Sequence, residues 1–570
     1  MIGLNKIGLN QVQLNRLRLN APFPTCRKMA GGGGSSDGFP QLPGDVTRWY
    51  FGGLTNEMMA AMDDPRIEDA DGKGRFLSFK NFAWKGMSGV GGYVGDFSKW
   101  VNNRDTTEIG ITKSNSKVII DVKVSQGSGK NIVFISKSNL GISNNVTIKI
   151  TSTYPEGVMK FANSASNKYL KLPSNGIITL QDNPEYTSNE MHLHLASADL
   201  GQITIEQLPL YPGALVFDGV DDYGVCENFP ILTKEKGYTV VALRQWITRG
   251  ERALGLVSNV KNWLNNGAFL LEYRNIQADH LNKPISFGAI GSEMDLPHIL
   301  TYQTSKSYNG VSITTGNFEG TDVLHVGKLA PTNVGTCINA AIWELVFLDH
   351  DATEEELTKI KDYFVKTYPW LFPDQAWTVV GKTNEDEDRA TITNITGNGN
   401  DLVLSNFGFI EGNGYNEEGQ YAGYLVTDGV DDKIASSDFK MGKDFTIVGD
   451  WKFIGNKKSG TGLVKGSSFY IYNTMIGLDL YINSGSVKNS LDGIKSINAA
   501  CSDGRAYDRN WNEILANTGN VVGSGGILEV SSSGGRFDRI AFKNLAIYPR
   551  ILSKDDCIKA YNYLQTLKAK

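Results

Sequence analysis

A long internal repeat constrains the fold more strongly than any other feature of this chain. Residues 215–222 read LVFDGVDD, and residues 425–432 read LVTDGVDD. Each copy is followed by an apolar run, YTVVALRQWI at 238–247 and FTIVGDWKFI at 445–454. Runs of this length that are rich in β-branched and aromatic residues predict strands. The chain is therefore expected to carry two copies of one β-rich module.

Each copy ends with an apolar strand-like run that leads into a predicted helix, at 338–368 and at 539–567. In the first copy, Thr353 precedes a Glu-rich turn, which is a typical capping pattern. In the second copy, Ser553 and Asp556 form the same capping box with Asp in the acidic role. Both modules are thus expected to end in a capped helix.

The repeat also extends upstream of the DGVDD motif. WYFGGLTNE at 49–57 is similar to WTVVGKTNE at 377–385. In the second copy this upstream part leads quickly to the motif, whereas more than 100 residues intervene in the first. Residues 104–209 contain seven short apolar runs at a spacing of roughly ten residues, which is typical of an immunoglobulin-like sandwich. We expect a separate domain there, because insertion into a surface loop costs little free energy.

These observations predict an all-β chain of tandem concanavalin-like jelly-roll sandwiches with an inserted immunoglobulin-like β-sandwich and an extended N-terminal arm. A chain of 570 residues is long enough for three or four cores. The predicted divisions are an arm at 1–30, a Gly-rich linker at 31–44, a first module at 45–103 and 210–372, an inserted sandwich at 104–209, and a second module at 373–570.

The N-terminal segment has a shorter period. Residues 2–20 read IGLNK, IGLNQ, VQLNR and LRLN, and GGGGSS follows at 31–36 as a flexible tether. A period of five matches neither a helix nor a simple strand. One interpretation is an extended tail, and another is an attachment arm that adds strands to a neighbouring subunit. The apolar residues of this arm are Ile2, Leu4, Ile7, Leu9, Val12, Leu14, Leu17 and Leu19.

Composition excludes several classes of partner. The net charge of -5 arises from interspersed acidic and basic residues, which gives no support for a nucleic acid or an anionic membrane partner. No stretch reaches 18 consecutive apolar residues, so we expect no membrane insertion. The first residues lack the pattern of a signal peptide, and the five cysteines are scattered without a CxxC pair. We therefore expect synthesis in a reducing cytoplasm.

The DGVDD turns are candidate metal sites, because carboxylate oxygens are the ligands that calcium prefers. The alternative is structural: Asp-Gly starts a tight turn and the other acids cap backbone amides. No EF-hand spacing is present, so both interpretations stay open. Calcium is the one cofactor that these residues suggest. The six candidate ligands are Asp218, Asp221, Asp222, Asp428, Asp431 and Asp432.

Together the DGVDD strand, the FTIVGDW-type strand and the closing strand with its EEEL-type helix resemble laminin-G/concanavalin A-like lectin modules. SYNGVSI at 307–313 matches the YNG hairpin of this family, and AYDRNWNEI at 506–514 lacks its Gly. With the IGLN repeat, the chain resembles structural proteins of phages that infect Bacteroidetes, including crAss-like phages. The resemblance implies a head or tail fibre or decoration protein on the virion surface, docked to capsid or tail proteins by its arm. It also implies a homo-oligomer, as a dimer or a trimer.

Host surface glycan is the ligand that such lectin-like modules imply. Sugar sites on sandwiches combine exposed aromatic rings with polar loop residues. Trp246, Trp343 and Trp451 lie inside apolar runs and are expected in the core. The candidate glycan-binding residues, which lie in polar or Gly-rich surroundings, are Trp263, Tyr273, Tyr308, Tyr507 and Trp511.

We expect no enzymatic activity and no catalytic residues. No ExDxxE run, GxSxG, HExxH or P-loop occurs in the sequence. His192 and His194 form an HxH pair on one strand, with no third ligand evident. The alternatives to an adhesin are a purely structural virion spacer without a ligand, and a secreted carbohydrate-binding protein or glycoside hydrolase.

Overall fold

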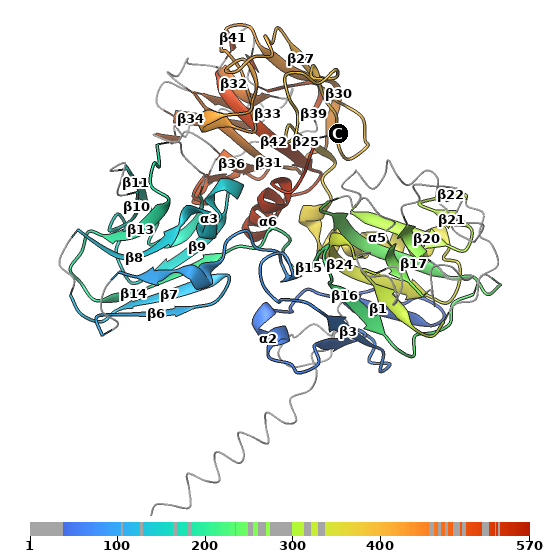
Figure 1. The fold of residues 1–570 in the computed structure, drawn as a ribbon. Coiled ribbons are helices and arrows are strands. Elements are labelled where there is room, and N and C mark those ends of the chain that lie inside the picture. Colours follow the sequence, from blue (N-terminus) through green and yellow to red (C-terminus); the bar gives the residue numbers. More distant parts are fainter. Residues whose placement is uncertain are drawn as a thin grey trace, which may run out of the picture.

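The computed structural model describes residues 38–569 with internal gaps. The stretches outside the description are 1–37, 104–106, 126–128, 164–167, 181–184, 234, 249–254, 260–269, 274–298, 313–320, 329–336, 455–460, 466–468, 474–476, 483–490, 493–496, 516–523, 531, 534–535, 538 and 570. The described residues form antiparallel sheets of five to eight strands and a two-stranded ribbon. These sheets confirm the predicted all-β class of packed sandwiches. Figure 1 shows them as three β-rich bodies around a short central helix, α6 (Lys554–Leu564).

One sheet of the first module has eight strands, in the order β22-β21-β20-β17-β24-β15-β4, with β1 also paired to β24. Its central strand β17 is buried at every residue. Val240 and Ala242 face one hydrophobic cluster, and Val241 and Leu243 face another. A strand covered on both faces needs a continuous apolar run, which explains the segment VVAL at 240–243. The strands are β1 (Val46–Tyr50), β4 (Gly89–Val90), β15 (Leu215–Asp218), β17 (Thr239–Trp246), β20 (Leu300–Thr304), β21 (Ser307–Tyr308), β22 (Val311–Ser312) and β24 (Asn339–Leu348).

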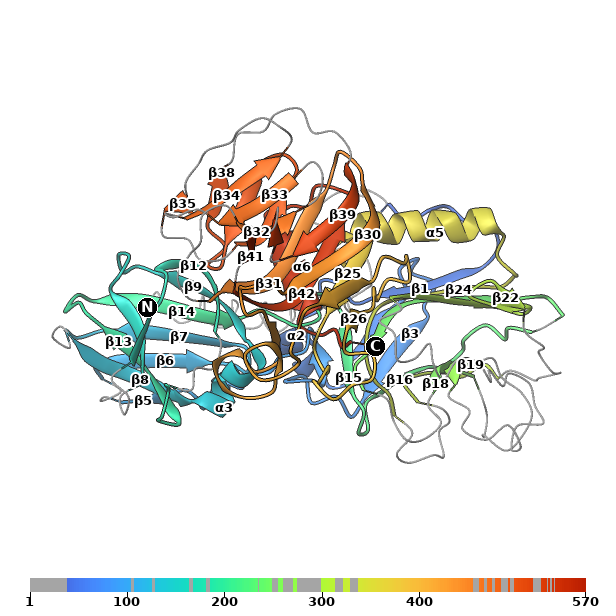
Figure 2. The ribbon, with the colours of Figure 1, turned by 90° about the horizontal axis from the view of Figure 1, so that it is seen from above.

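The facing sheet of the first module has six strands, in the order β19-β18-β23-β16-β3-β2. Helix α5 (Glu354–Thr367) runs along the outer side of the eight-stranded sheet, so the module is layered as helix, sheet and sheet (Figure 2). Trp246 and Phe217 belong to the core between the two sheets. The six strands are β2 (Arg66–Glu68), β3 (Phe76–Lys80), β16 (Tyr223–Cys226), β18 (Gly255–Ser258), β19 (Leu270–Tyr273) and β23 (Leu324–Val326).

The second module repeats the first sheet strand by strand, and its second sheet has the same order with two further strands, β34 and β35, at one edge. Its first sheet has the order β28-β29-β42-β31-β36-β37-β38, with β25 also paired to β42, and its second has the order β26-β27-β30-β39-β32-β33-β34-β35. The strands are β25 (Gln375–Thr378), β26 (Thr391–Ile392), β27 (Leu402–Ser405), β28 (Gly414–Asn416), β29 (Tyr424–Val426), β30 (Lys433–Met441), β31 (Thr446–Phe453), β32 (Thr461–Lys465), β33 (Phe469–Asn473), β34 (Gly477–Ile482), β35 (Leu491–Asp492), β36 (Ile497–Cys501), β37 (Arg505–Asp508), β38 (Glu513–Leu515), β39 (Ser524–Val530), β42 (Ile540–Tyr548) and the ribbon β40 (Ser532–Ser533) and β41 (Arg536–Phe537).

The two modules agree in detail as well as in strand order. The pairing of β17 with β24 shifts register after Leu243, and that of β31 with β42 shifts after Asp450. Thr239 Oγ1 donates to the carbonyl of His350 at 2.8 Å and accepts from the Ala352 N–H at 2.7 Å. In the second module, Thr446 Oγ1 makes the corresponding bonds to Arg550 and Leu552, both at 2.9 Å. The duplication therefore preserves the link between the central strand and the segment before each helix.

The inserted body is a sandwich of two five-stranded sheets, β11-β10-β13-β8-β5 and β12-β9-β14-β7-β6. All seven strands expected from the apolar runs are present. The partners are nested: β7 pairs with β14, β8 with β13, β9 with β12 and β10 with β11. This nesting is the strand order of a jelly roll, which differs from the immunoglobulin order. The strands are β5 (Val101–Asn102), β6 (Ile109–Lys113), β7 (Lys117–Val122), β8 (Lys130–Ser136), β9 (Thr147–Ser152), β10 (Met159–Asn163), β11 (Lys168–Lys171), β12 (Asn175–Thr179), β13 (Glu190–Leu195) and β14 (Gly201–Gln207).

The three bodies are joined through a hydrophobic core around α5 and α6, the helices that end the first and the second module. One hydrophobic cluster contains residues of α5, of α6 and of the sheets that contain β24 and β42, and Ile177 of the inserted body packs against it. Tyr548 Oη donates to the carbonyl of Trp370 at 2.8 Å, and Gln245 Nε2 donates to Thr566 Oγ1 at 2.9 Å. The other helical segments are α2 (Asn56–Ala60), α3 (Lys137–Leu140), η1 (Phe97–Lys99), η2 (Ile142–Asn144), η4 (Pro369–Leu371) and η5 (Gly419–Tyr421). Among the described residues, no helix is long and apolar enough to cross a membrane.

The predicted helix caps are present, with one difference. Thr353 and Glu356 form a complete capping box at the start of α5. At the start of α6, Ser553 Oγ accepts from the Asp556 N–H at 3.1 Å, but the Asp556 carboxylate accepts from the Ser553 hydroxyl instead of its backbone amide. Asp is one methylene shorter than Glu, which accounts for the missing reciprocal bond. The predicted box at Ser553 is therefore only half formed.

The tryptophans that the sequence predicts in the core are buried, and the described cysteines form no disulfide. The tryptophans expected in the core, Trp246, Trp343 and Trp451, are all buried. Four of the five cysteines are described, and these four are buried and unpaired. Within the stretch assigned to the linker, the Phe39 ring packs against Tyr363, with ring centroids 5.1 Å apart. The last part of that stretch therefore lies against the first module.

Candidate functional site

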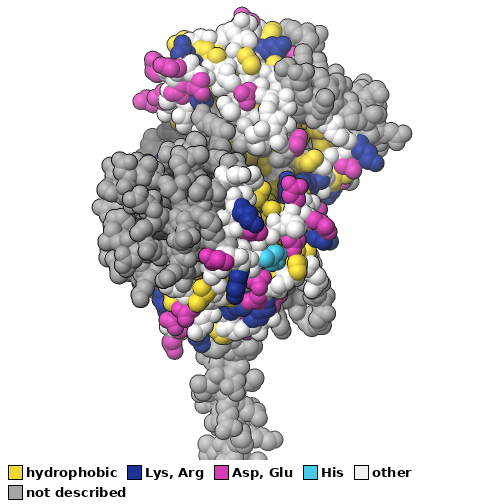
Figure 3. All heavy atoms as spheres, turned by 90° about the vertical axis from the view of Figure 1, so that its right-hand side faces the viewer, with side chains coloured by type: hydrophobic (Ala, Val, Ile, Leu, Met, Phe, Trp, Pro, Cys, Tyr) yellow, Lys and Arg dark blue, Asp and Glu magenta, His cyan; other side chains and the backbone are white. Residues whose placement is uncertain are grey.

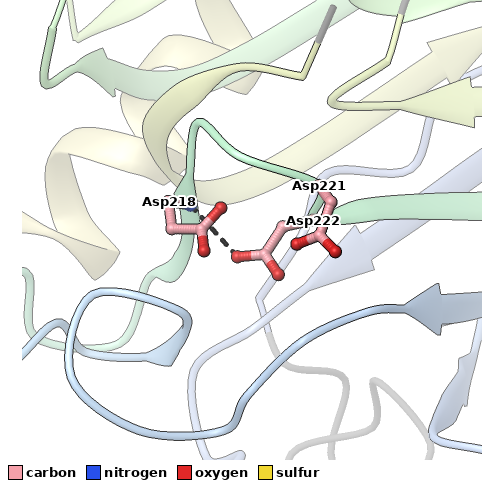
Figure 4. Close-up of side chains that lie close together, drawn as sticks. All are labelled: Asp218, Asp221 and Asp222. Carbon is pink, nitrogen blue, oxygen red and sulfur yellow. Dashed lines mark hydrogen bonds between the residues drawn. The ribbon is translucent and has the colours of Figure 1, made fainter. Parts of the chain in front are cut away.

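The six aspartates of the two DGVDD turns form two acidic triads. In each triad one carboxylate oxygen per residue lies within 4.8 Å of the others. Figure 4 shows the first triad, with Asp218, Asp221 and Asp222 gathered where the chain leaves β15 for β16. Within the described part of the chain, these two triads are the clusters with the spacing of a metal site. The triads are Asp218, Asp221 and Asp222, and Asp428, Asp431 and Asp432.

Hydrogen bonds within each turn fix two of the three aspartates. Asp222 Oδ2 accepts from the Asp218 N–H at 3.0 Å, and Asp218 Oδ1 accepts from the Val220 N–H at 2.8 Å. Asp432 and Asp428 make the equivalent bonds at 2.6 and 2.7 Å. The structural interpretation of the turn is therefore correct for these oxygens. These bonds do not involve the carboxylates of Asp221 and Asp431, which are available to another ligand.

A hairpin from the upstream repeat lies against each turn. Asn81 Nδ2 donates to the Asp221 carbonyl at 3.1 Å, and Asn406 Nδ2 donates to the Asp431 carbonyl at 2.9 Å. Both asparagines have left-handed backbones, with φ of 68° and 69°, which Asn tolerates better than most residues. Sequence reasoning missed this pair, although the Asn-Phe step in the two upstream repeats, KNFAW and SNFGF, marks it.

The third aspartate of each triad is a buried acid. Asp222 and Asp432 are both fully buried. Burial raises the pKa of Asp222 to about 7, and the nearby Asp218 and Asp221 add to this effect. Burial likewise raises the pKa of Asp432 to about 7, with Asp428 and Asp431 contributing. Each triad therefore has a buried carboxylate whose charge is unfavourable unless a proton or a cation accompanies it.

The geometry of the triads fits a hard cation. Calcium binds oxygen ligands at 2.3–2.6 Å, so two oxygens on opposite sides of the ion are about 4.8 Å apart. Asp221 and Asp431 are exposed, which leaves one side of each triad open to water or to a ligand. The triads offer only carboxylate oxygens, with no thiol and no imidazole. This donor set suits calcium or magnesium better than zinc.

An open groove of about 450 Å³ lies beside the first triad, between the first module and the inserted sandwich. Gly86 N–H donates to Asn115 Oδ1 at 2.8 Å across this boundary. The polar residues of its lining include Lys85, Ser88, Tyr93, Asp96, Asn115 and Asp218. The groove gives a small polar ligand access to Asp218.

The aromatic candidates for glycan binding do not form a stacking surface. Tyr308, Tyr507 and Trp511 are 4%, 0% and 1% exposed. Trp511 packs edge-on against Tyr561 of α6, with ring centroids 5.6 Å apart. The expectation that these three rings contact sugar is corrected by their burial, since they belong to cores or to the helix interface. Tyr273 lies in β19 but its side chain is outside the described residues, as is the whole of Trp263.

The arm residues and the two histidines of β13 do not add to the acidic triads. The apolar residues of the arm, from Ile2 to Leu19, lie outside the described residues. His192 stacks near Phe134, with centroids 5.4 Å apart, whereas His194 Nδ1 lies 3.2 Å from Asn131 Oδ1. A register shift in β13 falls between them. The two imidazoles thus have separate protein partners.

The surface charge agrees with the sequence. Figure 3 shows acidic and basic side chains mixed over the described part of the face in view, without a field of one sign. A mixed surface gives no long-range attraction for a polyanion.

Comparison with known proteins identifies no family. No family model matches the chain, and no curated protein matches it. Among solved structures, domain 4 of the GH43 arabinanase AbnA from Geobacillus stearothermophilus is 12% identical and covers 33% of this chain and 98% of its own, at a TM-score of 0.24. Trypanosoma rangeli sialidase is 11% identical over 88% of this chain and 69% of its own (TM-score 0.25). The binding domain of botulinum neurotoxin serotype D is 11% identical over 61% and 89% (TM-score 0.23). Likeness at these TM-scores carries no argument about function.

Proposed function

We propose that this chain is a non-enzymatic surface protein of a phage virion that presents lectin-like sandwiches to host glycan. The observation that carries the proposal is the duplication of one sandwich module, with the same strand order in the first sheet and an acidic turn in both copies. Two modules on one chain raise the overall avidity of weak sugar sites. Oligomerisation as a dimer or trimer multiplies that avidity further.

In this proposal the N-terminal arm anchors the chain to capsid or tail proteins. Its support is the five-residue repeat in residues 2–20 and the GGGGSS tract that follows. Deletion of residues 1–30 is expected to abolish incorporation into the particle and to leave the sandwiches folded. The test is incorporation of the truncated chain during phage assembly, with circular dichroism of the purified chain as the folding control. Normal incorporation of the truncated chain would refute the anchor.

Calcium is the cofactor that we propose for the acidic turns, bound at one turn or at both. The open side of each triad and its oxygen donors support this choice. An ion held there would stabilise the buried carboxylate and would offer free coordination positions to sugar hydroxyls. Glycan binding is then expected to weaken when calcium is removed with EGTA.

A structural spacer without a ligand is the second candidate function. The burial of Tyr308, Tyr507 and Trp511 favours it, and so does the hydrophobic cluster shared by the modules, which makes a stiff unit. A glycan array and a host-cell binding assay with the full chain separate the two functions. Binding supports the adhesin, whereas no binding with or without calcium supports the spacer.

A further inference from the structure

We infer that the two acidic turns are not equivalent, and that the turn of Asp428, Asp431 and Asp432 is the one that binds a divalent cation of the calcium class. In the first turn a serine hydroxyl takes the place of the ion. Only the choice of a calcium-class ion rests on the proposed function. The difference between the two turns follows from the hydrogen bonds around Asp222 and Asp432.

The two turns share nearly all of their local hydrogen bonds. The backbone bonds at Asp222 and Asp432 correspond, and so do the contacts of Asn81 and Asn406. One further position of the adjacent hairpin is equivalent: Ser88 Oγ accepts from the Ala83 N–H at 2.8 Å, and Asn413 Oδ1 accepts from the Gly408 N–H at 2.9 Å. Ser88 and Asn413 therefore occupy the same place in the two modules.

The difference lies in what these two side chains donate to. The Ser88 hydroxyl donates to Asp222 Oδ1 at 3.0 Å, so both oxygens of that buried carboxylate have a hydrogen-bond partner. Asn413 Nδ2 instead donates to Asp428 Oδ2, at 3.2 Å. Asp432 Oδ1 therefore has no hydrogen-bond partner. It is also shielded from water, because the Asp432 side chain is fully buried.

A buried carboxylate oxygen without a partner is costly, and it points to a missing ligand. The Asp432 carboxylate lies beside the carboxylates of Asp428 and Asp431, with one oxygen of each of the three residues within 4.8 Å of the others. These neighbours repel an anion and attract a cation. Three carboxylates around one point suit an ion that prefers several hard oxygen ligands, with water completing its shell on the exposed side of Asp431.

A proton is the other occupant that could satisfy Asp432 Oδ1, and the experiment must distinguish it from a metal ion. The full-length chain is stripped with EDTA, and calcium binding is measured by isothermal titration calorimetry at pH 7.5, with magnesium in a parallel titration. We expect one calcium ion per chain. Asp432→Asn is expected to lose binding at least tenfold, and the matched variant Asp222→Asn is expected to retain it.

An exchange of the hairpin residues gives a second test that does not remove a carboxylate. Asn413→Ser is expected to supply the missing hydroxyl to Asp432 and to weaken calcium binding at least tenfold. The matched change Ser88→Asn in the first turn is expected to leave the affinity of the second turn unchanged. Circular dichroism and the unfolding midpoint confirm that each variant is folded.

Three results would overturn the inference: no calcium binding by the wild-type chain, two ions bound with equal affinity, or unchanged binding by the Asp432→Asn variant. The first result would assign a proton to Asp432. Glycan binding is measured separately, so an ion bound at the second turn without any glycan binding would refute the adhesin and leave the cation site in place.

Discussion

Arg48 and Glu344 form an ion pair in the interior of the first module, with 2.8 Å between Arg48 Nη1 and Glu344 Oε1. Both residues are almost fully buried. The pair also joins α5 to the sheet, because Arg48 Nη1 donates to Tyr363 Oη at 3.0 Å and Tyr368 Oη donates to Glu344 Oε2 at 3.0 Å. Pairing of β1 with β24 holds both residues in place.

Removal of one partner of this pair is expected to be strongly destabilising. Glu344→Leu leaves a buried guanidinium without its counter-ion, and we expect a loss of about 3–5 kcal/mol in the free energy of unfolding. The double variant Arg48→Met with Glu344→Leu is expected to lose less than the sum of the two single variants. Urea unfolding of all four proteins measures this coupling. Additive losses would show that the pair does not act as a unit.

The bridging threonines provide a test of the duplicated architecture. Thr446→Val keeps the shape of the side chain but leaves the Arg550 carbonyl and the Leu552 N–H without their buried partner. We expect a loss of about 1–3 kcal/mol, and a similar loss for Thr239→Val. The conservative changes to Ser retain the hydroxyl and serve as controls. A loss at only one of the two positions would contradict the equivalence of the bridges.

The two helix caps are expected to respond differently to substitution. Thr353→Ala breaks a complete capping box and should cost about 1 kcal/mol. Asp556→Glu should complete the half-formed box at α6 and stabilise the protein by on the order of 0.5 kcal/mol. Asp555→Glu, one position earlier in the same turn, is the matched control and should change little. Thermal unfolding of the three variants measures these differences.

Stability in the absence of divalent ions is expected to fall as the pH rises from about 4 to about 7. The pKa values of Asp222 and Asp432 are raised from 3.8 to about 7, so the folded protein holds more protons than the unfolded chain in this range. Their favourable contribution is complete below the unfolded pKa and is lost as the pH passes the folded pKa. Urea midpoints at several pH values in EDTA measure the slope.

Asp432→Asn is expected to flatten this dependence of stability on pH, because the amide carries no proton to lose. Glu417→Gln removes an exposed carboxyl of the same module and is expected to leave the dependence unchanged. A slope that is identical in the wild-type chain and the Asp432→Asn variant would show that Asp432 does not titrate between pH 4 and 7.

Strand positions could be predicted from the sequence because they depend on local patterns. The run VVAL at 240–243 is apolar at consecutive positions, which is the pattern of a strand covered on both faces. The exposure of single aromatic residues could not be predicted in this way. Trp511 lies among polar residues, yet it is buried because Tyr561, 50 positions later, packs on it from α6.

The sequence by itself determined that the chain contains two equivalent β modules with an insertion in the first, because duplicated motifs and apolar periodicity do not depend on the rest of the fold. Only the tertiary structure decided how the two acidic turns differ. Ser88 lies 134 positions from Asp222 in the chain, and it reaches that carboxylate because the folded hairpin lies over the turn. Asn413 lies at the same place in the second module and bonds to Asp428 instead. Identical DGVDD motifs therefore acquire different hydrogen-bond partners from residues that lie far away in the sequence or at the equivalent position.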